Sequence, residues 1–173
     1  KTFGGNLRTE ARGLLQRATR QRLRMSEGMT YEGCKVSPRN VIAAVDAYFP
    51  SIWQITASME AAASTNVKLN NPLVFEWTSV LADNAKVDAE AKAGKKPVSK
   101  KGRKLWRNNV LVYEVTEMLV VKALALYNQA GITVGAVAAN DTSCHNEAAS
   151  SLRQGAGAMD YIAGPLLPRW IKV

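Results

Sequence analysis

Two places in this sequence hold residue types that carry out chemistry in proteins. The first is the pair Cys144 and His145, a nucleophile next to a base. Neighbouring residues on a helix point about 100° apart, so the pair is not expected to form a dyad. The other cysteine, Cys34, adds no metal-ligand spacing to the single histidine. We therefore predict no catalytic, cofactor-binding or metal-binding residue, and we interpret both cysteines as reduced thiols of an intracellular protein.

The second place is Glu114, a carboxylate near the start of a long apolar stretch. A buried carboxylate needs a partner such as a backbone N–H or an arginine. No second acid or base stands beside Glu114 in the sequence, so we favour a structural role for it over a catalytic one.

The apolar stretch around Glu114 runs from Asn108 to Gly131. Wound as a helix, it leaves only a narrow polar strip, formed by Glu114, Glu117, Lys122 and Gln129. Asn108 or Asn109 can cap the first turn, and Gly131 can supply the left-handed residue that ends it. We predict a helix over 108–130 that is the central helix of a soluble helical domain and is too polar for a comfortable membrane span.

Composition favours one domain with a real core, because the 173 residues are 47% hydrophobic. Twenty-three Lys and Arg against fourteen Asp and Glu give a net charge of +9. Such a charge favours acidic partners, namely nucleic acid, anionic lipid or an acidic protein surface. Charge alone does not choose among these three classes.

Three further helices are predicted, over 7–25, 38–63 and 143–163. The first has an apolar stripe with a basic back, formed by Arg8, Arg12, Arg17, Arg20, Arg22 and Arg24. A basic amphipathic helix can lie on an anionic membrane or on nucleic acid, but an ordinary solvated face is the favoured interpretation.

The second helix opens at Ser37 and Pro38, and we expect Pro50 to kink it without breaking it. Its apolar face includes Tyr48, Phe49 and Trp53. The last helix has small residues that permit a close crossing, and its predicted apolar stripe is Ala149, Leu152, Gly155, Ala156, Met159, Ile162 and Ala163. We expect Pro165 and Pro168 to end it.

Alternating residues predict one strand over 73–80, with Phe75 and Trp77 facing the aromatic side of the second helix. Its partner strand is expected in the first residues or at 67–69. The segment 82–107 loses the apolar pattern and is predicted to be a basic loop insertion. Its candidate contacts to an acidic partner are Lys95, Lys96, Lys100, Lys101, Arg103 and Lys104.

The order of these motifs resembles the first half of a Bro domain, the boomerang-shaped helical domain of the Alix type in ESCRT-associated proteins, and especially plant and algal Bro-like proteins. The resemblance covers roughly residues 5 to 168. Its motifs are VDAYFP at 45–50, FEW at 75–77, YE at 113–114, SLR at 151–153 and AGAM at 156–159.

The resemblance implies a mainly α fold, a curved and partly tetratricopeptide-like helical array with a small attached β element. Residues 1–173 would then be a single domain, the N-terminal portion of a longer Bro-like domain. It also implies a non-enzymatic scaffold that docks an amphipathic helix of an ESCRT-III-type partner in endosomal sorting, in the cytoplasm at endosomal membranes. An anionic membrane surface is a further partner in this interpretation, and nucleic acid is a less favoured one.

Two features depart from the Bro pattern. The Lys-rich stretch 92–104 looks like an insertion, and the partner-helix patch of the family lies mainly on helices that follow residue 173. The alternative hypothesis is a structural subunit of a larger assembly, in which the Bro-like scaffold contacts acidic protein or RNA through its basic segments.

Overall fold

A computed structural model describes residues 5–28, 37–63, 73–78, 105–135 and 142–168. Its elements are α1 (Gly5–Gly28), α2 (Pro38–Ala63), β1 (Phe75–Thr78), β2 (Leu105–Asn108), α4 (Leu111–Gly135), α5 (Thr142–Tyr161) and the π-helical turn η2 (Ile162–Leu166). The predicted class, mainly α with a small β element, is confirmed.

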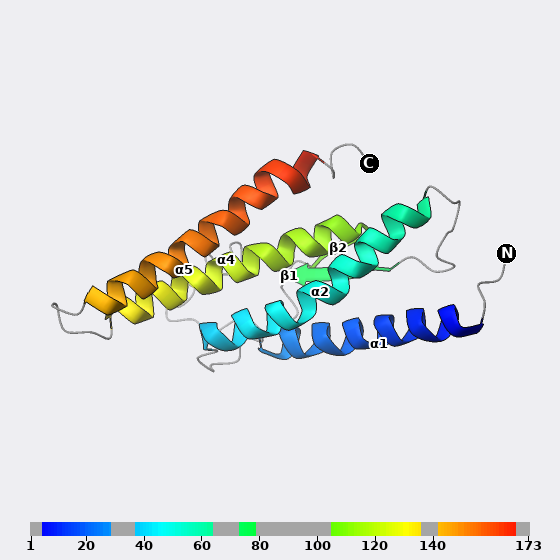
Figure 1. Cartoon of the computed structure of the whole chain (residues 1–173), viewed down its shortest axis with the longest axis horizontal. Coiled ribbons are helices and arrows are strands. Elements are labelled where there is room, and N and C mark those ends of the chain that lie inside the picture. The colour runs from blue at the N-terminus through cyan, green and yellow to red at the C-terminus, as the bar shows by residue number, and fades with distance from the viewer. Residues whose placement is uncertain (1–4, 29–36, 64–72, 79–104, 136–141, 169–173) are drawn as a thin grey trace, which may run out of the picture.

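The helices lie side by side in the order α5, α4, α2 and α1, and each packs on the next (Figure 1). The predicted central helix is therefore confirmed, because α4 has α2 on one side and α5 on the other. By length and hydropathy α4 is also, within the described ranges, the one helix that meets the criteria for a membrane span. The core helix of a globular protein meets the same criteria.

Both predicted ends of α4 need correction. The helix starts at Leu111 because Asn108 still belongs to β2, although the Asn108 side chain does accept the N–H of Val110 at 3.0 Å. At the other end the helix continues through Gly131 to Gly135. Glycine permits the left-handed conformation that ends a helix but does not impose it.

The predicted bounds of α2 agree with the structure. The N–H groups of Asn40 and Val41 bond to the carbonyl of Ser37, which closes the first turn around Pro38. The helix continues through Pro50, as predicted.

The partner of β1 is β2, in antiparallel register with Phe75 opposite Asn108. β2 was not among the predicted partners, and residues 1–4 and 67–69, where a partner was expected, lie outside the described residues. The prediction of a loop reaching as far as residue 107 was wrong. A strand of four residues next to a basic run is too short to show alternation. Arg107 instead pairs with Glu76 across the sheet at 2.7 Å between Nε and Oε1.

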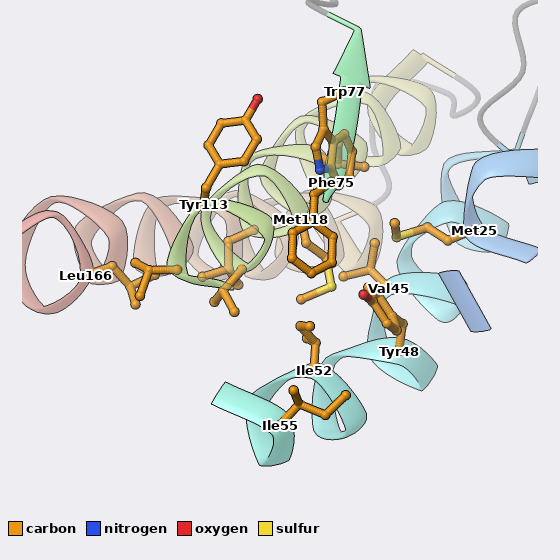
Figure 2. Close-up of a cluster of buried hydrophobic side chains, with 14 of the residues drawn as sticks. Met25, Val45, Tyr48, Ile52, Ile55, Phe75, Trp77, Tyr113, Met118 and Leu166 are labelled. Atoms are coloured by element: carbon orange, nitrogen blue, oxygen red, sulfur yellow. The ribbon is translucent and has the colours of Figure 1, made fainter. Parts of the chain in front are cut away.

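Phe75 and Trp77 face the core, each 7% exposed, in one hydrophobic cluster with Tyr48. The cluster side chains converge from β1, α2 and α4 (Figure 2). Phe49 stacks on Trp53 at its edge, with ring centroids 5.9 Å apart. The predicted contact between the strand and the aromatic helix face is thus confirmed.

The predicted close crossing of α4 and α5 is confirmed at Gly155, where a Cβ atom would lie 3.4 Å from the carbonyl oxygen of Ala123. The predicted stripe of α5 was partly wrong, since Leu152 is 46% and Met159 38% exposed, and Ala156 and Ala163 are exposed as well. The face toward α4 is instead built on small residues such as Ala148 and Ser151. Small residues bring the backbones together, and the larger side chains are then turned outward.

Pro165 does not end the last helix, contrary to the prediction. Residues 162–166 form a π-helical turn in which the N–H of Leu167 bonds to the carbonyl of Ile162. The wider turn accommodates a residue that has no N–H. The chain therefore stays helical as far as Pro168, and Leu166 is buried with an exposure of 1%.

Candidate functional site

The carboxylate of Glu114, in the first turn of α4, is fully buried and is hydrogen-bonded from three other elements. Arg22 of α1 donates from Nε to Oε1 at 2.7 Å and lies with its second nitrogen 3.5 Å from Oε2. Tyr48 of α2 donates its hydroxyl to Oε1 at 3.1 Å. Trp77 of β1 donates its indole N–H to Oε2 at 2.6 Å. Each carboxylate oxygen therefore accepts two hydrogen bonds.

Arg22 was predicted to belong to the solvated basic back of the first helix, and this prediction was wrong. It lies four residues after Ala18 and three before Met25, the two buried residues of α1, so it shares their helix face. This spacing was a signal available in the sequence. The predicted need of Glu114 for a partner, a backbone N–H or an arginine, is confirmed, and the partner is the arginine Arg22.

The guanidinium of Arg22 is held in place by more than Glu114. It donates to the carbonyl of Glu76 at 3.0 Å, and it lies 5.4 Å from the ring centroid of Trp77 and 6.0 Å from that of Phe75. Aromatic faces attract cations, so the strand fixes the arginine from two directions. The side chain is only 27% exposed.

Burial raises the pKa of Tyr48, and the negative charge of Glu114 and the hydrogen bond to it raise this pKa further. The Tyr48 hydroxyl therefore stays protonated and remains a donor. With both oxygens of Glu114 occupied, the cluster has no position for a substrate to accept or give a proton. Its geometry is that of an anchor joining α1, α2, β1 and α4, which agrees with the structural role favoured from the sequence.

Tyr113, directly before Glu114, and Glu117, one turn after Tyr113, form a second titratable pair on α4. Burial raises the pKa of Glu117, and the hydrogen bond with Tyr113 partly opposes that rise. The pKa of Tyr113 is raised by burial and by the charge of Glu117. Glu117 is half-buried, so this pair lies at the edge of the core.

At the opposite end of α4 an open groove of about 1090 Å³ lies between the start of α2, the last turns of α4 and the start of α5. Its exposed apolar wall consists of Tyr127 (67% exposed), Ile132 (55%), Val134 (46%) and Leu152 (46%). The groove was not predicted, since it depends on α4 continuing beyond Gly131 and on the outward rotation of Leu152.

The rim of the groove is polar. Arg39 of α2 and Glu147 of α5 both line the groove, are both exposed, and pair at 3.4 Å between Nη2 and Oε1. The half-buried Cys144 also lines it, with its Sγ 3.9 Å from the Oγ of Ser143, whereas His145 is exposed. Within the described segments, no group of three or more His, Cys, Asp or Glu is placed to hold a metal ion.

The remaining candidate residues lie outside the described residues. These are Cys34 and the proposed acidic-partner contacts Lys95, Lys96, Lys100, Lys101, Arg103 and Lys104.

Comparison of the chain with protein-family models, with curated proteins and with solved structures finds no match.

Proposed function

We propose that this chain is a non-enzymatic protein-interaction scaffold whose groove docks the apolar face of an amphipathic helix. The observation that carries the proposal is the gathering of four large, exposed apolar side chains around one groove. Soluble proteins rarely leave such side chains together unless a partner covers them.

The dimensions of the groove suit a helix. Its α4 wall runs from Tyr127 to Val134, which at about 1.5 Å per residue is about 11 Å, or two helical turns. A docking helix presents anchors at i, i+3 or i+4, and i+7, which occupy about that length. Pockets for small ligands are closed clefts of about 300 to 1,000 Å³, whereas this site is an open trough of about 1090 Å³.

The charge of the whole chain and the start of α2 favour a helix with acidic flanks. The chain carries a net charge of +9, and the N-terminus of α2, which has a partial positive charge, lies at the groove, where Arg39 is balanced by its ion pair with Glu147. Complementary charge at a rim mainly raises the association rate and its salt sensitivity, while the apolar contacts supply affinity.

The resemblance to Bro domains supplies a class of partner, the C-terminal amphipathic helix of an ESCRT-III subunit. The helix-docking patch of that family lies mainly after residue 173. The groove is therefore proposed from the geometry of this chain, as a surface separate from that patch. The saturated hydrogen bonds of Glu114 support the non-enzymatic part of the proposal, because they leave this buried carboxylate no free position for acid or base work.

The test is the binding of a fluorescent ESCRT-III C-terminal peptide to the full chain, followed by polarisation. Ile132→Asp should weaken binding at least about tenfold, because it places a charge in the apolar wall. The matched control is Val74→Asp, an equally exposed apolar residue just before β1 (58% exposed) and outside the groove lining. Equal affinities of both variants and the wild type would contradict the proposal.

RNA is the second ligand in the same assay, at low and at high salt. Steeply salt-dependent RNA binding, together with no peptide binding, would favour the alternative of a structural subunit that contacts RNA or acidic protein through its basic segments.

A further inference from the structure

The arginines of α1 divide into two sets. Arg22 points into the molecule and binds Glu114, whereas the side chains of four others are exposed: Arg12, Arg17, Arg20 and Arg24. None of these four pairs with an acidic residue of the described segments. The sequence holds no Asp or Glu between Glu10 and Glu27. The outer side of α1 therefore carries charge that the fold does not neutralise.

The four exposed arginines share one face of the helix. At about 100° per residue they fall within an arc of about 140°, and the centre of this arc is about 160° from the buried pair Ala18 and Met25. The same arc contains Leu23, which is 57% exposed. A large apolar side chain thus protrudes on the basic face, about one turn after Arg20.

The position of α1 leaves this face open. The helix is one of the two outer helices of the row, and it packs on α2 along one side (Figure 1). Its 24 residues form a rod of about 36 Å. A straight, outward, basic helix face fits an extended planar partner better than a small compact one.

We propose that this face of α1 docks the protein on an anionic membrane surface, with its arginines on lipid phosphates and Leu23 entering the boundary of the acyl chains. Guanidinium groups bind phosphate oxygens in pairs, and a basic amphipathic helix lies in the plane of the headgroups. This surface lies on a different helix from the groove, and it does not depend on the function proposed above.

Lipid fits this face better than RNA does. Proteins that bind single-stranded RNA stack its bases on aromatic side chains in a basic groove. No aromatic residue occurs in α1, and its basic face is a convex helix side. Leu23 gains contact by entering lipid, whereas a phosphate backbone offers it none.

The test is co-sedimentation of the full chain with vesicles of phosphatidylcholine alone and of phosphatidylcholine with phosphatidylserine. The wild type should bind the anionic vesicles selectively. The variant Arg17→Glu, Arg20→Glu, Arg24→Glu should lose roughly a hundredfold in partitioning, about fivefold for each basic residue. Leu23→Ser should lose severalfold.

The control variant has the same net charge because it reverses three exposed arginines elsewhere, Arg39→Glu, Arg107→Glu and Arg153→Glu, the first two of which also lose an ion pair. It should keep nearly all anionic-vesicle binding. Unchanged circular dichroism and melting temperature would establish that both triple variants fold.

Three results would overturn the proposal: equal losses in the two triple variants, no selective binding by the wild type, or salt-sensitive RNA binding without vesicle binding. Soluble glycerophosphoserine should compete only weakly, because a bilayer presents many phosphates to one face. Full competition by that headgroup would assign a site for a free phosphate ester and overturn docking on a membrane.

Discussion

The first and the last turns of α4 both carry apolar side chains, but the two ends lie in opposite environments. At Glu114 every hydrogen-bonding position of a buried carboxylate is taken by α1, α2 and β1. Around Ile132 and Leu152, apolar side chains are left at the surface of a groove. One end of the helix joins four elements, whereas the other end, within the described segments, is flanked by the starts of α2 and α5.

Stability and recognition are therefore expected at opposite ends of α4. A buried charge is tolerated only when it is paired, so the Glu114 end must be formed completely or not at all. Exposed apolar side chains add little to folding, so the groove end can change without unfolding the molecule. The following four predictions test this contrast.

The largest effect is expected for Glu114→Ala. Removing the carboxylate leaves the donors of Arg22, Tyr48 and Trp77 without their acceptor. The free energy of unfolding should therefore fall by about 3 to 5 kcal/mol. Urea titration measures it. The control is Glu147→Ala, an exposed helical glutamate in an ion pair, which should cost less than about 1 kcal/mol. A loss below about 1 kcal/mol at Glu114 would show that the cluster does not hold the fold.

Trp77→Phe should have the second largest effect. It keeps an aromatic ring in the buried cluster but deletes the N–H that donates to Glu114, which should cost about 1.5 to 3 kcal/mol. Trp77→Ala removes the ring as well and should cost about 3 to 5 kcal/mol. If the two variants lost the same amount, the ring packing would contribute nothing beyond the hydrogen bond.

A smaller, pH-dependent effect is expected at Glu117. Its pKa is raised in the folded state, so its contribution to stability is fully present below the unfolded pKa and is lost as the pH rises through the folded pKa. Glu117→Gln cannot ionise and should therefore be slightly more stable than the wild type at neutral pH, but not in acid below the unfolded pKa. Melting curves across this range test the sign, and a variant less stable at neutral pH would refute it.

The smallest effect on stability is expected at the groove. Ile132→Asp should change the free energy of unfolding by no more than about 0.5 kcal/mol, because the native side chain is 55% exposed. Urea titration beside Val74→Asp measures this. A large destabilisation would mean that the α4 wall is part of the core, and the contrast between the two ends would disappear.

Local signals in the sequence predicted much of this fold. Ser37 and Pro38 marked the start of α2 correctly because capping depends on adjacent residues. Glu114 was identified as a carboxylate in need of a partner, either a backbone N–H or an arginine, but the choice of Arg22 depends on how α1 packs. β2 was missed because its pairing is set by contact with β1, far away in the chain.

The candidate site was less predictable than the fold. The groove is formed by three segments that meet only after folding, and its wall depends on the rotation of α5. The close approach of Gly155 to Ala123 is part of the packing that sets this rotation, and periodicity does not encode such packing. The stripe predicted for the last helix therefore placed Leu152 on the wrong side.

Amide hydrogen exchange along α4, with and without the ESCRT-III peptide, tests the contrast most directly. Residues 112–119 should exchange only through global unfolding in both conditions, since their side chains are locked in the core. Residues 127–134 and 144–152 should exchange faster in the free chain and become protected when the peptide binds. Equal protection of both ends in the free chain, or peptide protection confined to 112–119, would contradict the account.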